Sequence, residues 1–68
     1  MKIIYSKSGM GVTYANGNYQ EYEAMRTVIY DEVSDICHIM WCDGEVNERE
    51  IDSYFSIQSP DNGSIIEF

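Results

Sequence analysis

Sixty-eight residues suffice for one small hydrophobic core. A chain of this size buries only about 60% of the surface that its unfolded form exposes. Hydrophobic residues make up 44% of the chain and aromatic residues 13%, which is enough for one core and too apolar for a chain that stays disordered. We therefore expect a single domain over residues 1–68. Because a catalytic cleft is normally walled by a larger scaffold, we also expect a protein that is not an enzyme.

Neither a membrane span nor a secretory signal is predicted. The longest uninterrupted apolar run, Ile39–Cys42, is far shorter than the roughly 20 residues that span a bilayer. The first residues, MKIIYSKSG, lack the apolar segment of a secretory signal. Cys37 and Cys42 are too close in sequence for a disulfide that staples a domain, and we expect both to be thiols packed in the core. These features predict a cytoplasmic protein, in the host cytoplasm if the protein is viral.

Negative charge is concentrated in the later part of the chain. The net charge is −8, from 12 acidic and 4 basic residues. Residues 1–26 are close to neutral, whereas residues 27–68 hold ten acids and one cation, Arg49. Affinity for phosphate comes from lysine and arginine, so we expect no direct binding to nucleic acid or to membrane surfaces. Concentrated acid either keeps a protein soluble or meets a partner with a basic face.

Three short segments have the composition of β-strands. Residues 2–6, KIIYS, and residues 12–15, VTYA, are rich in β-branched and aromatic residues and are separated by a cluster of turn residues. Residues 36–42, ICHIMWC, contain a single polar side chain and are predicted to form a buried central strand. This segment is the best candidate for the core.

The end of the chain predicts another strand. Residues 64–68, SIIEF, follow the sequence SPDNG at 59–63, which is strong turn chemistry. If residues 54–57 are extended, the two segments form a hairpin. Residues expected to share one face of that hairpin are Phe55, Ile57, Ile66 and Phe68.

Residues 19–33 carry a different pattern. Their apolar residues recur in steps of three and four, as on one face of a helix, and Asn18 with Glu21 has capping-box spacing. In the alternative interpretation Asn16–Gly17 closes a two-residue hairpin. We predict an α+β fold, in which a helix over about 19–33 packs on a small antiparallel sheet of about 3–5 short strands. The alternative is an all-β small barrel of the SH3-like type.

The acidic stretch WCDGEVNERE also allows two structures. Asn47 and Glu50 have the spacing of a capping box, and Val46 and Ile51 have that of a hydrophobic staple. These spacings predict a second, short helix over 48–55.

The other structure is a hairpin. Asp43–Gly44 would form a type I′ turn, with residues 45–50 returning along the 36–42 strand. The earlier stretch YANGNYQEYE has a similar pattern, which either local turn chemistry or duplication of a unit explains. In both structures the carboxylates face solvent, and the residues expected on the buried side are Val46, Ile51, Tyr54 and Phe55.

No metal or cofactor site is predicted. Asp43, Glu45 and Asn47 have the spacing of the first EF-hand ligands, but Glu48 and Tyr54 stand where that loop needs glycine and a bidentate glutamate. The sulfur and imidazole side chains around residue 38 lack the spacing of a zinc site.

Two segments resemble known families. IMWCDGEVNEREI resembles the WxDG hairpin of SH3-like and Tudor-like barrels, over about a fifth of the chain. GVTYANGNY resembles part of one MORN repeat. The first resemblance implies a binding module in which several of the tyrosines and Trp41 form an aromatic cage for a methylated cation.

The favoured function is a small acidic inhibitor or adaptor. Its carboxylates would occupy the basic surface of a larger protein, such as the nucleic-acid groove of an enzyme or complex, and aromatic residues would anchor the contact. In size and acidity the chain resembles viral antidefence proteins, including anti-CRISPR proteins and DNA mimics. The alternatives are the aromatic-cage module and a structural subunit of a larger assembly. The predicted partner-binding residues are Asp31, Glu32, Asp35, Trp41, Asp43, Glu45, Glu48, Glu50, Asp52 and Tyr54.

Overall fold

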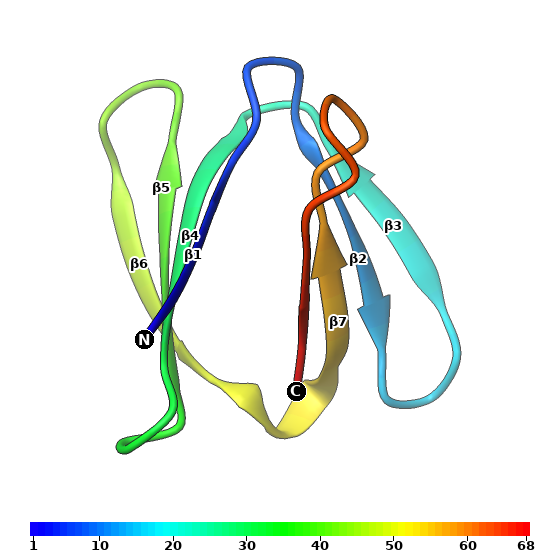
Figure 1. The fold of residues 1–68 in the computed structure, drawn as a ribbon, viewed down its shortest axis with the longest axis vertical. Helices are drawn as coiled ribbons and strands as arrows, with labels where there is room; N and C mark the ends of the chain where they lie inside the picture. Colours follow the sequence, from blue (N-terminus) through cyan, green and yellow to red (C-terminus); the bar gives the residue numbers. More distant parts are fainter.

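The computed structural model describes all 68 residues and contains eight strands in two antiparallel sheets (Figure 1). The first sheet has the strand order β1–β4–β5–β6 and the second has the order β3–β2–β7–β8. The strands are β1 (Lys2–Tyr5), β2 (Met10–Tyr14), β3 (Tyr19–Tyr22), β4 (Met25–Asp31), β5 (Ile36–Trp41), β6 (Val46–Glu50), β7 (Tyr54–Gln58) and β8 (Ile65–Glu67).

The hydrophobic core lies between the two sheets. Because successive side chains of a strand point to opposite faces, each strand can turn alternate residues inward. The sheets approach each other at β1 and β8, the edge strands next to the two chain ends (Figure 1). Cys37 is buried as predicted, whereas Cys42, predicted in the core, is exposed. Fully buried aliphatic residues are Val28 and Ile39 of the first sheet and Val12, Ile57 and Ile66 of the second.

Two strands and a tight turn occupy the segment predicted as a helix, so the α+β prediction is wrong. Residues 19–33 form β3, a turn, β4 and the start of the next turn. The β content agrees with the all-β alternative, although the strands form two four-stranded sheets. Asn16–Gly17 closes the hairpin between β2 and β3, and β2 pairs with β3 over its length.

A β-bulge in β4 explains the misleading periodicity. Met25 and Thr27 pair with neighbouring residues of β5, so Arg26 is an extra residue in β4. The bulge places both Met25 and Val28 in the core, three positions apart. A helix also repeats in steps of three and four, and the pattern of this strand therefore resembled that of a helix.

The second predicted helix, over 48–55, is also wrong. These residues belong to the end of β6, to a single 3₁₀ turn, η1 (Ile51–Ser53), and to the start of β7. The hairpin is correct, because Met40 pairs with Val46 across the turn, but the type I′ turn is wrong, because Gly44 has a positive φ and Asp43 does not. One turn of 3₁₀ helix is all the helix in the chain, and it cannot cross a membrane.

The two similar stretches, YANGNYQEYE and WCDGEVNERE, form the same turn. The Gly17 N–H donates to the carbonyl oxygen of Tyr14 at 2.9 Å, and the Gly44 N–H donates to that of Trp41 at 3.0 Å. In each turn the preceding Asn or Asp side chain accepts a hydrogen bond from the backbone N–H two residues further on. Local turn chemistry therefore accounts for the repeated pattern.

A second bulge turns Phe55 out of the core. We predicted that Phe55 shares a face with Ile57, but residues of β2 pair with Ser56 and Tyr54, which leaves Phe55 unopposed between them. Tyr54 thus takes the inner position and is 9% exposed, whereas Phe55 is 59% exposed.

The turn between β1 and β2 packs on the turn between β3 and β4. Gly9 has a φ of +105°, and a Cβ atom here would lie 2.7 Å from the Cα of Glu23 and 2.7 Å from the carbonyl oxygen of Tyr22. Only glycine fits this backbone conformation and this close approach. The β1–β2 turn also contacts the segment between β7 and β8, because Asp61 accepts hydrogen bonds from the backbone N–H of Lys7, at 2.7 Å, and from the Ser8 hydroxyl.

Gly9→Ala is expected to lower the free energy of unfolding by about 2–4 kcal/mol, because backbone strain adds to an overlap with main-chain atoms. Gly17→Ala is the matched control. Gly17 also has a positive φ, +90°, but nothing lies within 4 Å of an added Cβ, so strain alone costs about 1–2 kcal/mol. Urea denaturation followed by Trp41 fluorescence measures both losses. Equal losses would contradict the packing of the two turns.

Candidate functional site

The outer face of the first sheet is largely apolar. The register aligns Ile3 with Ile29, and Ile29 with His38, in one row across the sheet. A second row runs parallel to it through Tyr5, Thr27, Met40 and Val46. Exposed fractions on this face reach 61% for Ile3, 57% for Tyr5 and 53% for Val46, which we predicted to be buried. Contiguous exposed apolar surface of this kind is typical of a protein-binding site.

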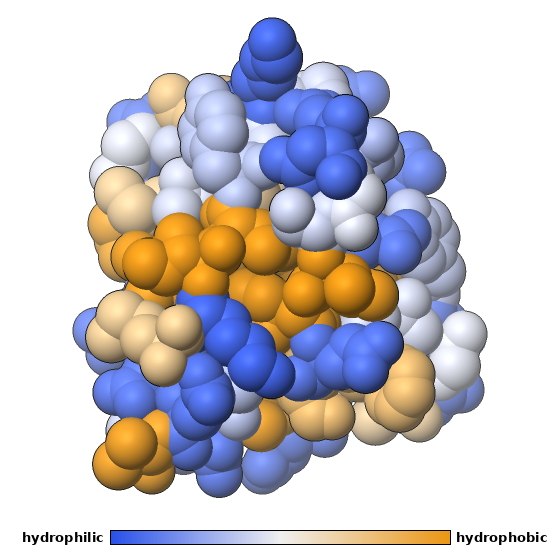
Figure 2. Space-filling view, in the orientation of Figure 1, coloured by the Kyte–Doolittle hydropathy of each residue, from blue (hydrophilic) through white to orange (hydrophobic).

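A further apolar area lies near the junction of the two sheets. Seen from the side on which both chain ends lie, a band of hydrophobic residues crosses the middle of the molecule between polar regions (Figure 2). The strands β1 and β8 run through this part of the view (Figure 1). Each carries an exposed isoleucine, Ile3 on β1 and Ile65 on β8.

Eight of the twelve carboxylates lie on the edge strand β6 or near the two ends of the first sheet. Glu48 and Glu50 project from that face along the edge strand β6, opposite His38 and Ile36. Residues two apart on a strand lie about 6.6 Å from each other, so these two carboxylates form a short line of charge. The others lie at the two ends of the sheet: Asp31, Glu32 and Asp35 at the β4–β5 turn with Asp52 in η1, and Asp43 and Glu45 at the β5–β6 turn.

No lysine or arginine side chain forms an ion pair with these acids. Glu32 contacts the terminal ammonium of Met1 at 2.9 Å, and Glu48 lies 3.5 Å from Nδ1 of His38. Arg49, the one cation of residues 27–68, lies on the inner side of the sheet, because it pairs in the register with the buried Cys37, but it remains exposed on the edge strand. The outer face therefore keeps its negative border.

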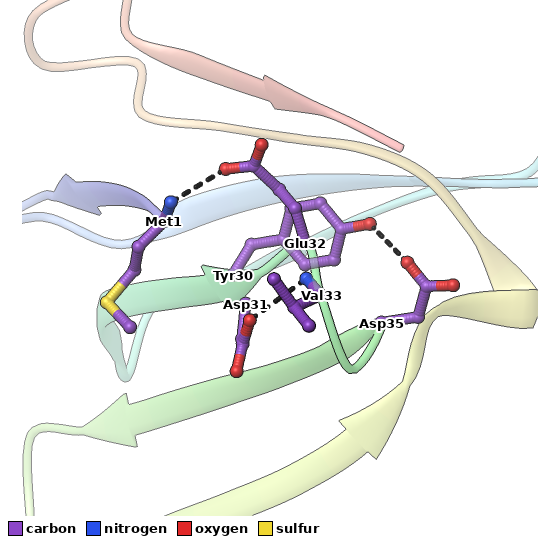
Figure 3. A network of polar contacts seen from close by, with 6 residues as sticks. All are labelled: Met1, Tyr30, Asp31, Glu32, Val33 and Asp35. Carbon is purple, nitrogen blue, oxygen red and sulfur yellow. Dashed lines mark hydrogen bonds and ion pairs between the residues drawn. The ribbon is translucent and has the colours of Figure 1, made fainter.

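The β4–β5 turn fixes its carboxylates by hydrogen bonds (Figure 3). Asp31 accepts from the Val33 N–H at 3.0 Å, and this bond is the main reason that the pKa of Asp31 is lowered. The Tyr30 hydroxyl donates to Asp35 at 2.8 Å, which raises the pKa of Tyr30 to about 12. Asp35 has a φ of +56°, in the left-handed region that Asp tolerates better than most residues.

The two predicted aromatic anchors do not share a surface with the acids. Trp41 and Tyr54 lie on the inner side of their sheets and line a pocket of about 50 Å³ between them. Tyr54 stacks on Tyr14 with ring centroids 5.7 Å apart, and Trp41 meets Tyr22 edge to face at 5.9 Å. A partner on the outer face would therefore use other apolar side chains as anchors.

The charged side chain at this pocket is Arg49. Burial raises the pKa of Tyr54, and the positive charge of Arg49 opposes that rise. The pKa of Tyr14 is raised to about 12, mainly because the hydroxyl is buried and to a smaller extent because it shares a hydrogen bond with the Tyr22 hydroxyl.

Sequence reasoning named Trp41 and Tyr54 of this pocket as candidates for binding a partner, but it identified neither Arg49 nor the apolar outer face. A signal for Arg49 existed, because a strand that turns Glu48 and Glu50 outward must turn Arg49 inward. Comparisons of the chain with protein-family models, with curated proteins and with solved structures found no match.

Stability is expected to fall as the pH drops below about 4, because hydrogen bonds lower the pKa values of Asp31 and Asp61 from their ordinary value of 3.8. The folded form then binds protons less readily than the unfolded form. The stabilisation is complete above the ordinary pKa and is lost as the pH falls through the lower folded values. Circular dichroism melts from pH 6 to pH 2 measure the effect.

Asp61→Asn should show a smaller fall in Tm over this range, since it removes one of three carboxyl groups with a lowered pKa, the third being Glu32, whose pKa is lowered by its contact with the terminal ammonium of Met1. Asp52→Asn is the control, because Asp52 makes no side-chain hydrogen bond, and its Tm should follow that of the unsubstituted protein. A fall in the Asp61→Asn variant as large as in the unsubstituted protein would contradict the role of Asp61.

Proposed function

We propose that this protein is a non-enzymatic binding protein that docks the outer face of its first sheet on a basic surface of a larger protein. The observation that supports this proposal is an exposed apolar sheet face with an acidic edge strand, β6, and acidic segments near both ends of the sheet, where no carboxylate is paired with a lysine or arginine. The apolar centre supplies contact area, and the acidic border supplies attraction and specificity.

The chemistry of this face favours a basic partner over a second copy of the chain. Two copies meeting through the same face would bring their acidic borders together in a protein whose net charge is already −8. Like charges at an interface cost several kcal/mol, whereas a positive surface is attracted. A partner of opposite charge is therefore the better match.

A basic surface on a protein is commonly a nucleic-acid-binding surface, because phosphate affinity comes from lysine and arginine. Occupying it would exclude the nucleic acid, so the proposed role is that of an inhibitor. The similarity in size and acidity to DNA mimics and anti-CRISPR proteins supports this type of role. The aromatic-cage alternative has less support, since Arg49 beside the aromatic pocket would repel a methylated cation.

Charge reversal at Glu48 and Glu50 is expected to weaken partner capture at least tenfold, because it removes the acidic edge of the outer face. The immobilised protein is incubated with lysate of a candidate host, and captured proteins are quantified at increasing salt. DNA or RNA added as a competitor should release the captured protein.

The test variant carries both Glu48→Lys and Glu50→Lys. Its matched control is a second double variant, which carries Glu21→Lys and Glu67→Lys. Both double variants change the net charge equally, but Glu21 and Glu67 lie on the second sheet. The control should capture the partner normally. Equal losses of capture in the two double variants would mean that only the overall charge matters. If added DNA or RNA does not release the captured protein, the inhibitor role is excluded.

Met40→Ser is expected to weaken capture by about 1–2 kcal/mol, since it removes an apolar contact from the middle of the outer face. Phe55→Ser is the control, because Phe55 is also an exposed apolar residue but belongs to β7 of the second sheet. Binding is measured by titration with the captured partner, after melts establish that both variants are folded. Unchanged affinity for Met40→Ser would place the contact elsewhere.

A further inference from the structure

The pocket between the sheets combines an apolar floor with aromatic walls. Its floor consists of the buried residues Val12, Met25 and Ile39. Its walls are the rings of Tyr14, Tyr22, Trp41 and Tyr54, and Arg49 stands beside them from β6. This part of the molecule is separate from the outer face proposed above to bind a protein.

The polar groups at this pocket include a donor without a hydrogen-bond partner and a guanidinium without a carboxylate partner. The Trp41 indole N–H is buried and has no hydrogen-bond partner. Arg49 forms no ion pair, although the chain contains 12 carboxylates. No aspartate or glutamate lines the pocket. A buried donor without a partner is uncommon in folded proteins, and here it coincides with a guanidinium that has no carboxylate partner and whose contact with Tyr54 opposes the rise in the pKa of that tyrosine.

We propose that the pocket binds a carboxylate carried on a short apolar group. A guanidinium presents a planar set of donors that suits a carboxylate, and the indole N–H supplies a further donor. The aromatic walls and aliphatic floor suit the apolar part of the ligand. The positive charge of Arg49 disfavours a cationic ligand.

The size of the pocket limits the ligand. A site needs about 10–15 Å³ on this measure to hold one water molecule, so 50 Å³ admits a group of only about four to six heavy atoms. A nucleotide does not fit. A small aliphatic acid fits, and so does the carboxyl-terminal end of another polypeptide.

Because Trp41 is the only tryptophan, its indole N–H gives a single signal that reports on the pocket. Butyrate is titrated into ¹⁵N-labelled protein at constant ionic strength, with chloride as the reference anion. A saturable downfield shift of the indole signal is expected, with a Kd on the order of 1 mM for so small a ligand. Butyramide, which has the same shape without the charge, should bind at least tenfold more weakly.

Arg49→Gln should weaken butyrate binding at least tenfold, and Arg49→Lys should weaken it less, since lysine keeps the charge but not the planar donor set. Arg26→Gln is the control, because Arg26 does not line the pocket and its guanidinium donates to the carbonyl oxygen of Glu23. It should bind butyrate normally. The exposed position of Arg49 makes it suitable for substitution, and melts verify the folding of each variant.

A short peptide ending in alanine, with a free or an amidated carboxyl terminus, identifies the source of the carboxylate. If the peptide with a free carboxyl terminus binds more tightly than butyrate and amidation abolishes this binding, the natural ligand is the end of a polypeptide. If the peptide binds no more tightly than butyrate, the natural ligand is a small acid. A shift that does not saturate, or one that is equal for butyramide or in Arg49→Gln, overturns the proposal. Because this test uses no macromolecular partner, its result is independent of capture by the outer face.

Discussion

Packing of the two inner sheet faces is the interaction on which the rest of this molecule depends, and not every strand takes an equal part in it. All eleven buried hydrophobic residues come from six strands. The two strands that contribute none, β3 and β6, are edge strands, one in each sheet. Because β6 contributes no buried hydrophobic residue, it can carry charged side chains on both faces, with Glu48 and Glu50 on the outer face and Arg49 on the inner face. One strand thus contributes to both regions to which we assign a function.

The two similar hairpins explain why these regions lie where they do. The β2–β3 hairpin and the β5–β6 hairpin each belong to a different sheet, and each places an aromatic residue, Tyr14 or Trp41, just before its turn. Both rings face the space between the sheets and line the pocket. Beyond each turn the chain continues into an edge strand without a buried hydrophobic residue, so the pocket lies where the packing of the core ends.

Local turn chemistry could be predicted from the sequence, whereas the bulges could not. Asn16–Gly17 and Asp43–Gly44 indicate where the chain turns, although the type I′ turn predicted at Asp43–Gly44 is wrong, and the apolar segment 36–42 predicts its strand. The bulges at Arg26 and Phe55 are set by pairing with strands distant in the chain, and each inserts a single residue that breaks the alternation. The first made a strand resemble a helix, and the second reversed the burial of Phe55.

The candidate site shows the same division between local and distant effects. The clustering of acids between residues 31 and 52 is visible in the sequence, because nearby turns and strands bring them to one sheet. Which face of that sheet a side chain occupies depends on register. For this reason Trp41 and Tyr54 were expected beside the acids, although they lie on the inner side, and the apolar row through Ile3 and Ile29 was not recognised.

Acid on an edge strand has an explanation that needs no partner, since charges there prevent pairing with the edge of another molecule. That explanation covers Glu48 and Glu50 on β6. It does not cover the exposed apolar residues Ile3 and Tyr5 of β1 and Met40 of β5. These side chains carry no charge, so they do not prevent pairing with another molecule. A sheet face that only had to remain soluble would alternate polar residues outward, as antiparallel sheets with one solvated face do. This combination of an apolar centre with an acidic border is the reason that we propose recognition of a basic, partly apolar surface in addition to a contribution to solubility.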